Sequence, residues 1–221
     1  SRGQTPYPFP KTANMQIHHL DLSSASLNQI EKLFKKTKSN LVLHFIALNG
    51  AKCQQDPKEA EKINFGITYK LSLICKKLNI PMGFCSTADV FPREGGPFAE
   101  DDPTGVIYSE NHVLNIYSWT KYRAEKAVSE ILFPKKLGFI FRISFPYNIE
   151  YIQKPGTAVM AFNTLAKGES WIAVKDMHMN PTSSYDIALG LNSLISKKVW
   201  LQEDPIFHLA SSEVLTGLDL A

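Results

Sequence analysis

Tyr117 and Lys121 are the two residues whose types and spacing point most directly to chemistry. At positions i and i+4 of a helix, their side chains share one face. An ammonium group beside a phenol favours the phenolate, so Lys121 is expected to lower the pKa of Tyr117 from its ordinary value near ~10. Such a pair would serve as an acid or a base near neutral pH.

Thr87 supplies a third group, a hydroxyl at the end of a predicted strand. Carbonyl reduction requires a proton donor, a group that tunes the donor and a hydroxyl that places the substrate oxygen. Thr87, Tyr117 and Lys121 provide these three parts. The spacing Y-x-x-x-K is weak evidence by itself, because most such pairs are a half-buried aromatic side chain beside a solvated charge.

The composition is that of an ordinary globular protein: 221 residues, 44% hydrophobic and 20% charged, with a net charge of +3. The densest basic cluster, Lys35, Lys36 and Lys38, fits a solvated helix end better than a nucleic-acid surface. No apolar run approaches the ~20 residues that span a membrane. With no signal-peptide pattern at the start, the sequence predicts a cytoplasmic protein.

The three cysteines, Cys53, Cys75 and Cys85, lack metal-ligand spacing. An odd number without a C-x-x-C pair fits a reducing compartment and argues against a disulfide framework or a zinc site. Each cysteine is expected to be buried, and no metal site is predicted.

Strand and helix patterns alternate along the first part of the chain. The expected elements are a strand at Met15–Leu20, a helix opened by Asp21–Ser24, a strand at Leu41–Ala47, a helix from Asp56 to Lys77, a strand at Ile80–Ser86, a helix carrying Tyr117 to about Leu132 and a strand at Leu137–Ile143. This alternation predicts an α/β fold with a doubly wound parallel sheet. Ala47, Thr87 and Ser144 would lie at the carboxyl edge, where such sheets bind ligands.

The pattern loosens from Glu150 onward. A helix is expected at Thr157–Lys167, a strand at Trp171–Lys175, a helix after Ser183 or Ser184 and a strand at Ile206–Leu209. The alternating part therefore ends near residue 149, and residues 150–221 form a second, less regular region.

The order of these landmarks resembles the extended short-chain dehydrogenase/reductase family, and most closely its dTDP-4-dehydrorhamnose reductase-like branch. The likeness spans nearly the whole chain and is more specific than Y-x-x-x-K alone. Its motifs are Leu43–Ala47, similar to "IHLAA"; Cys85–Phe91, similar to "ISTDYVF"; Leu114–Lys121, similar to "LNVYGRSK"; Arg142–Pro146; and Asn180–Thr182 with Asp186–Ala188, similar to "RPT…DDLA".

The resemblance implies roles for four catalytic residues. Tyr117 would transfer the proton, Lys121 would tune Tyr117 and hold the cofactor ribose, and Thr87 would orient the substrate oxygen. Asn64 would support Lys121 through water.

The resemblance also implies a Rossmann-like domain over residues 1–149 that binds NADP or NAD. It implies a substrate-binding region for a nucleotide sugar over residues 150–221, interleaved with the first domain. Residues implied to bind the cofactor are Arg2, Asp21, Leu22, Phe45, Ile46, Ala47, Cys85, Tyr117, Lys121, Ile143 and Ser144. Residues implied to bind the substrate are Thr87, Ala88, Asp89, Tyr117 and Asn180. Members often pair through the helix carrying the tyrosine, which implies a homodimer.

The sequence departs from the family pattern in two ways. It starts where the second strand of such a domain would be ending, without the strand, glycine-rich turn and helix that receive the pyrophosphate. Its last residues fall inside an expected helix. The resemblance therefore implies that this chain lacks the first βαβ segment and the end of the substrate region.

Two functions follow from the resemblance. The first is an NAD(P)-dependent oxidoreductase acting on a nucleotide-linked sugar, by 4-keto reduction in preference to epimerisation or dehydration. Ala88 and Asp89 replace the Asp-Tyr of the branch, which leaves rhamnose-type specificity open, and Asp89 is not adjacent to Thr87 as a dehydratase acid would be. The alternative is a non-catalytic nucleotide-binding regulatory subunit with the same fold.

Overall fold

The computed structural model describes residues 15–92, 95–105, 115–148, 156–173, 175–176 and 178–219. Its centre is a parallel sheet of four strands, β1 (Val42–His44), β2 (Met82–Thr87), β3 (Gly138–Ile143) and β7 (Ile206–Leu209), in the order β1-β2-β3-β7. The predicted α/β fold with a parallel sheet is confirmed. The strand predicted over Leu41–Ala47 is present but shorter.

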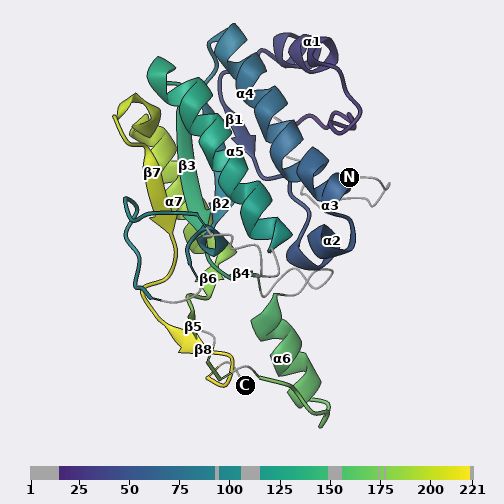
Figure 1. The fold of residues 1–221 in the computed structure, drawn as a ribbon, viewed down its shortest axis with the longest axis vertical. Helices are drawn as coiled ribbons and strands as arrows, with labels where there is room; N and C mark the ends of the chain where they lie inside the picture. The colour runs from purple at the N-terminus through teal and green to yellow at the C-terminus, as the bar shows by residue number, and fades with distance from the viewer. Residues whose placement is uncertain are drawn as a thin grey trace.

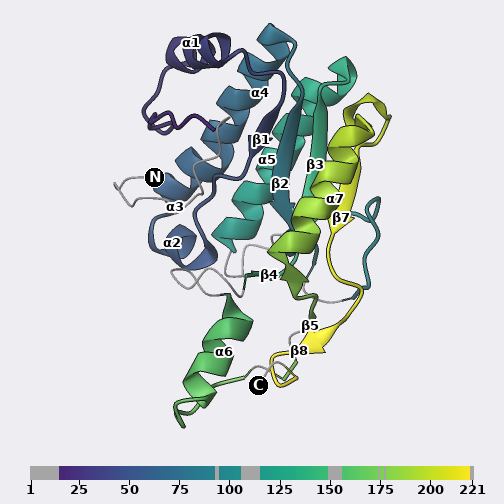
Figure 2. The same cartoon turned by 180° about the vertical axis from the view of Figure 1, so that it is seen from behind.

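Helices cover both faces of this sheet. The helices α4 (Ile67–Leu78) and α5 (Ile116–Leu132) lie side by side on one face, and α7 (Ser184–Ser196) lies on the other (Figures 1 and 2). The strands predicted at Ile80–Ser86 and Leu137–Ile143 are present as β2 and β3, and both are buried as central strands of a parallel sheet are.

The two faces of the sheet form two apolar clusters. Phe84 and Ile140 pack with Leu71 and Val128 under α4 and α5. On the opposite face, a second cluster joins β3 to α7 through Phe139, Phe141, Leu191 and Val199. Both clusters fix the strands whose carboxyl ends carry the predicted catalytic groups.

The first helix begins later than predicted. α1 (Leu27–Thr37) is capped by Ser26, whose side chain exchanges hydrogen bonds with Gln29 in a capping box. The Asp21 carboxylate instead accepts hydrogen bonds from Ser23 and Ser24, which closes a turn before the helix. The strand predicted at Met15–Leu20 is wrong, because these residues form no regular structure.

The helix predicted from Asp56 to Lys77 is interrupted. After α2 (Gly50–Gln55), the chain forms α3 (Pro57–Ala60), a π-helical turn, η1 (Glu61–Gly66), and then α4. A π-turn inserts an extra residue into the helix without disturbing its apolar face, so the periodicity did not reveal it. Such turns are frequent at functional sites, and this one contains Asn64.

Smaller elements gather beyond the carboxyl edge of the sheet, in the lower part of Figure 1. They are α6 (Thr157–Leu165), the pair β4 (Pro146–Tyr147) and β6 (Thr182–Ser183), and the pair β5 (His178–Met179) and β8 (Leu215–Thr216). The described residues of the predicted strand Trp171–Lys175 form no strand. The division into 1–149 and 150–221 stays a prediction.

Short helical turns complete the fold: η2 (Ala88–Val90), η3 (Phe133–Lys135) and η4 (Val199–Leu201). No helix in the described part of the chain is long and apolar enough to cross a membrane.

Gly83 in β2 provides a test of the packing between β2 and β3. A Cβ atom added at Gly83 would lie 2.3 Å from Cζ of the Phe139 ring, which is itself held under α7. We expect Gly83→Ala to lower the free energy of unfolding by about 1–3 kcal/mol, the usual cost of overpacking a core. Urea denaturation measures this change.

The matched control is Gly50→Ala, in the first turn of α2. An added Cβ there has no atom within 4 Å, so this substitution should leave stability unchanged or slightly raised. Equal stability of the Gly83 and Gly50 variants would contradict the close packing of Phe139 on β2.

Candidate active site

Tyr117 and Lys121 lie in the first turns of α5, at the carboxyl edge of the sheet. Asn115 caps this helix by accepting a hydrogen bond from the Ser118 amide at 3.2 Å. Lys121 is buried: its Nζ donates to the Cys85 carbonyl at 2.5 Å and lies 4.1 Å from the centre of the Phe84 ring. The lysine therefore ties α5 directly to the end of β2.

Thr87 ends β2 and meets Tyr117. The Thr87 hydroxyl lies close enough to the Tyr117 phenol to lower the pKa of that phenol, and Thr87 Oγ1 accepts a hydrogen bond from the Asp89 amide at 3.2 Å. The bond from Asp89 caps η2 and orients the threonine side chain. The structure thus brings together the phenol, the hydroxyl and, through Cys85, the ammonium group that the sequence had indicated.

The electrostatics of Tyr117 differ from the sequence prediction. Burial is the main cause that raises the pKa of Tyr117, and the negative charge of Asp89 raises it further. The neighbouring Thr87 hydroxyl lowers this pKa by a smaller amount. The prediction that Lys121 lowers the Tyr117 pKa is wrong in this structure. Burial lowers the pKa of Lys121 itself to about 8, and its ammonium group is directed to the Cys85 carbonyl.

Asn64 lies in the π-turn and is buried. Its Oδ1 accepts from the Leu48 amide at 2.7 Å, and its Nδ2 donates to Thr120 Oγ1 at 3.1 Å and lies within hydrogen-bond distance of the Leu48 carbonyl and Cys53 Sγ. The side chain thus joins the loop after β1 to α5. Its predicted support of Lys121 through water stays a prediction.

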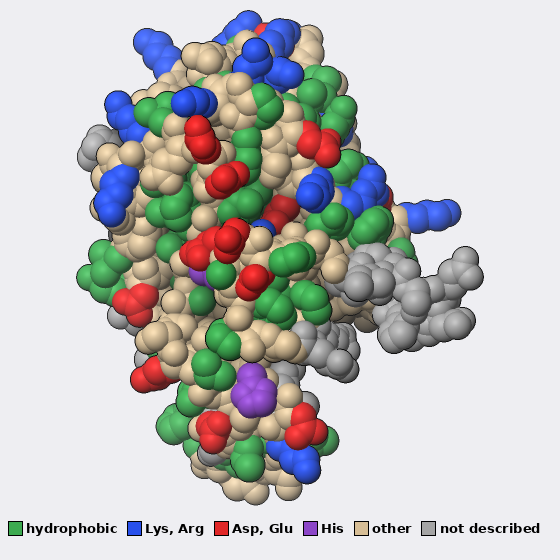
Figure 3. Space-filling view, turned by 60° about the vertical axis from the view of Figure 1, so that its left-hand side comes forward, with side chains coloured by type: hydrophobic (Ala, Val, Ile, Leu, Met, Phe, Trp, Pro, Cys, Tyr) green, Lys and Arg blue, Asp and Glu red, His purple; other side chains and the backbone are tan. Residues whose placement is uncertain are grey.

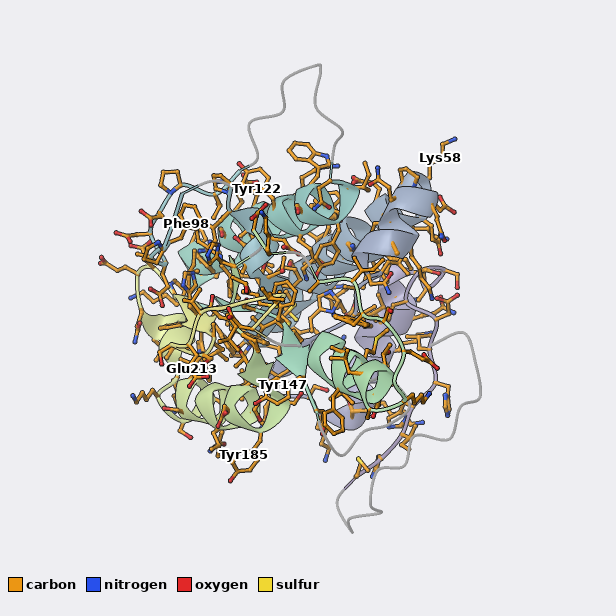
Figure 4. The ribbon with its side chains drawn as sticks, turned by 90° about the horizontal axis from the view of Figure 1, so that it is seen from below. Lys58, Phe98, Tyr122, Tyr147, Tyr185 and Glu213 are labelled. Atoms are coloured by element: carbon orange, nitrogen blue, oxygen red, sulfur yellow. The ribbon has the colours of Figure 1, made fainter. Side chains whose placement is uncertain are left out.

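Most of the predicted cofactor residues lie at the carboxyl edge. Phe45 and Ile46, just after β1, are 54% and 44% exposed, an unusual state for large apolar side chains. Ala47 is also exposed. Cys85 and Ser144 are buried at the ends of β2 and β3, and Ile143 is half-buried. Figure 4 views the molecule from this edge.

The other predicted residues make local contacts, lie in the exposed turn η2 or fall outside the described residues. Asp21 closes the turn before α1, and Leu22 packs against the core. Ala88 and Asp89 are exposed in η2. Arg2 lies outside the described residues.

Asn180 donates from Nδ2 to the carbonyls of Ser211 and Glu213, both at 3.0 Å. These two bonds fix the segment after β7. The contact of Asn180 with substrate stays a prediction. Nearby, Tyr147 lies between α6 and α7, where its carbonyl accepts from Ser184 Oγ at 3.0 Å (Figure 4).

Sequence reasoning missed a buried ion pair beside the site. Arg142 in β3 makes two hydrogen bonds of 3.0 Å to the Glu125 carboxylate of α5, and its Nη1 donates to the Glu100 carbonyl at 3.1 Å. The Glu100 carboxylate accepts from the His208 amide, which lowers the pKa of Glu100. An arginine inside an otherwise apolar strand was the available signal, since a buried charge requires a partner.

This ion pair holds the loop over residues 95–105 against the ends of β3 and β7. Phe98 of the loop stacks on Phe91, with ring centres 4.7 Å apart. Figure 3, which turns the β7 side toward the viewer, shows Asp and Glu side chains gathered across the middle of this face. The loop is therefore fixed to one flank of the edge that carries Thr87.

Known proteins share this architecture. A "Probable low-salt glycan biosynthesis reductase Agl14" of Haloferax volcanii is 25% identical over 211 residues, covering 94% of this chain and 65% of the relative. This chain thus spans less than two thirds of that protein's length.

Two solved structures are similar at the level of the fold. A hypothetical dTDP-4-dehydrorhamnose reductase of Sulfolobus tokodaii is 21% identical with a TM-score of 0.76, over 94% of this chain and 68% of that one. A dTDP-4-dehydrorhamnose reductase of Bacillus anthracis, in complex with NADP, is 20% identical with a TM-score of 0.74, over 91% and 67% of the two chains.

These likenesses agree with a match of the sequence to the family described as RmlD substrate binding domain. The match runs over residues 10–221, nearly the whole chain. The chain belongs to the RmlD substrate binding domain family.

Proposed function

We propose that the protein is an NAD(P)-dependent reductase that reduces the 4-keto group of a nucleotide-linked sugar. The observation that carries this proposal is that Thr87, at the end of β2, is near enough to the Tyr117 phenol to influence its pKa, while the same helix carries the buried Lys121. The relatives support it, because the Haloferax protein is named as a reductase of glycan biosynthesis and the Bacillus enzyme was crystallised with NADP.

The carboxyl edge fits a nicotinamide nucleotide. Phe45 and Ile46 offer an exposed apolar surface for flat rings, and Lys121 is a buried donor for ribose hydroxyls. Ser86, between Cys85 and Thr87, has a buried Oγ without a hydrogen-bond partner among the described atoms. A reduced nicotinamide supplies a hydride, while the protein supplies position and electrostatics.

Tyr117 would donate the proton of the reaction. Its raised pKa keeps the phenol protonated at neutral pH, ready for an oxygen that gains negative charge. The carbonyl carbon receives the hydride, the oxygen takes the proton from Tyr117 Oη, and the product is an alcohol. Thr87 would donate a hydrogen bond to the same oxygen, and Lys121 would hold the cofactor ribose.

Tyr117→Phe tests the proton donor. The substitution removes the hydroxyl and leaves the ring, so we expect kcat to fall by about 10²–10⁴-fold. The Kd for NADPH should change by less than about threefold, since uniform binding is separate from transition-state stabilisation. Absorbance of NADPH during turnover of a 4-keto sugar nucleotide and isothermal titration measure the two quantities.

Tyr122→Phe is the matched control, because it removes a half-buried phenol from the same helix and should leave turnover unchanged. Full activity of Tyr117→Phe would contradict the assignment of the donor. Failure of a protein that carries the pyrophosphate-binding segment together with this chain to bind NADPH or NADH would contradict the whole proposal.

The lowered pKa of Lys121 should make the free energy of unfolding depend on pH. Burial lowers its pKa from 10.5 to about 8 in the folded state, so at pH 7 the fold carries a buried charge at a cost. As the pH rises through 8, the folded state releases the proton before the unfolded state does, and stability rises until both are neutral.

The comparison with Lys121→Met isolates this effect, because methionine is never charged. Relative to that variant, the unmodified protein should gain about 2 kcal/mol between pH 7.5 and 9.5, from a slope approaching 1.36 kcal/mol per pH unit. Denaturation at each pH measures the gain. A constant difference across this range would show that Lys121 titrates at its ordinary pKa.

A further inference from the structure

A chain of buried hydrogen bonds crosses the core from β1 to α5. His44 Nε2 lies 2.9 Å from Thr68 Oγ1, and Thr68 Oγ1 donates to the Asn64 carbonyl at 2.7 Å. Asn64 Nδ2 donates to Thr120 Oγ1, which donates to the Tyr117 carbonyl at 3.0 Å. All four side chains from His44 to Thr120 are at most 2% exposed.

The donors and acceptors fix the tautomer of His44. Thr68 has one hydroxyl hydrogen, which goes to the Asn64 carbonyl, so its oxygen must accept from His44. His44 therefore carries its proton on Nε2. Burial and the nearby charge of Lys121 lower the pKa of His44 to about 3, which keeps the ring neutral. Its Nδ1 is buried without a hydrogen-bond partner in the described residues.

This network of hydrogen bonds positions Tyr117 and does not conduct protons. It ends on the backbone carbonyl of Tyr117 and not on the phenol, and it passes through an amide that does not exchange a proton in turn. The hydroxyls of Thr68 and Thr120 each donate and accept, so the two bonds at each hydroxyl strengthen one another, and Asn64 joins the two halves through its backbone carbonyl and its side-chain amide. Its geometric effect is to fix the first turn of α5 relative to β1 and the π-turn.

We propose that His44 is a positioning residue, which holds Tyr117 in place through Thr68, Asn64 and Thr120. This inference builds on the proposed reductase function, because its effect on turnover needs Tyr117 as the proton donor. The effect on the position of Tyr117 does not depend on the reductase function. A tyrosine misplaced by a fraction of an ångström loses the geometry of proton transfer while the surface that binds substrate stays intact.

The test removes hydrogen-bonding groups from the network with substitutions that nearly preserve side-chain volume. His44→Phe removes the Nε2 hydrogen, and Thr68→Val removes the hydroxyl with little change of shape. We expect each to lower kcat by about 10-fold or more with KM changed less than about twofold, since a fault in alignment acts in the transition state. The double variant should lose no more kcat than the more damaging single variant, because both substitutions break the same network.

Conservative variants separate positioning from packing. His44→Gln can present an amide hydrogen where Nε2 lies, and Thr68→Ser keeps the hydroxyl, so both should restore most of kcat. His44→Asn, whose amide ends near the Nδ1 position, should not. Loss of kcat that follows only the loss of stability in all five variants would overturn the proposal.

A second readout does not depend on the reductase function. In ¹⁵N spectra of the unmodified protein, the His44 ring should show the Nε2–H tautomer. His44→Phe should shift the amide signals of residues 117–121, and His44→Gln should largely preserve them. If the protein proves not to be a reductase, unchanged signals at these residues in His44→Phe would still overturn the positioning role, and shifted ones would support it.

Discussion

The burial of the Lys121 ammonium group is the constraint on which the site depends. The ammonium has one carbonyl acceptor, from Cys85, and the face of one aromatic ring, from Phe84. A charge in such a place is costly, and only a rigid surrounding keeps it there. That rigidity comes from the parallel strands, whose two apolar faces lock β2 between the helices, so that the end of β2 and the start of α5 meet at a fixed distance.

The loops at the carboxyl edge are also held in fixed positions. Parallel strands leave their carboxyl ends together, and the segments that follow them have to cross that edge. After β1 the chain exposes Phe45 and Ile46; after β2 it makes the Thr87 cap; between η2 and α5, Arg142 holds the loop over residues 95–105. Each segment is held by a different kind of interaction, yet all converge on the edge where Tyr117 lies.

Part of this arrangement was readable from sequence. A continuous apolar run identified the region of β1, and the alternation of strands and helices predicted the parallel sheet. Tyr117, Lys121 and Thr87 were singled out by type and order. The start of α1 was misjudged because several serines compete for the cap. The π-turn left the apolar period intact. The Tyr117 pKa depends on the depth of burial and on Asp89, which spacing alone does not report, and the contact of His44 with Thr68 exists only in the folded chain.

Two of the described cations are buried at α5: Lys121 belongs to this helix, and Arg142 of β3 faces it. Arg142 is matched by the Glu125 carboxylate through two hydrogen bonds, so its charge is compensated and its role is to hold β3, α5 and the loop over residues 95–105 together. Lys121 contacts a carbonyl and a ring, with no carboxylate bonded to it among the described residues, and its pKa falls to about 8. A charge left uncompensated in a core lowers stability, and such perturbed groups concentrate at functional sites. The difference between the two cations is therefore an argument, independent of any motif, that the chemistry of this fold lies at Lys121 and the tyrosine beside it.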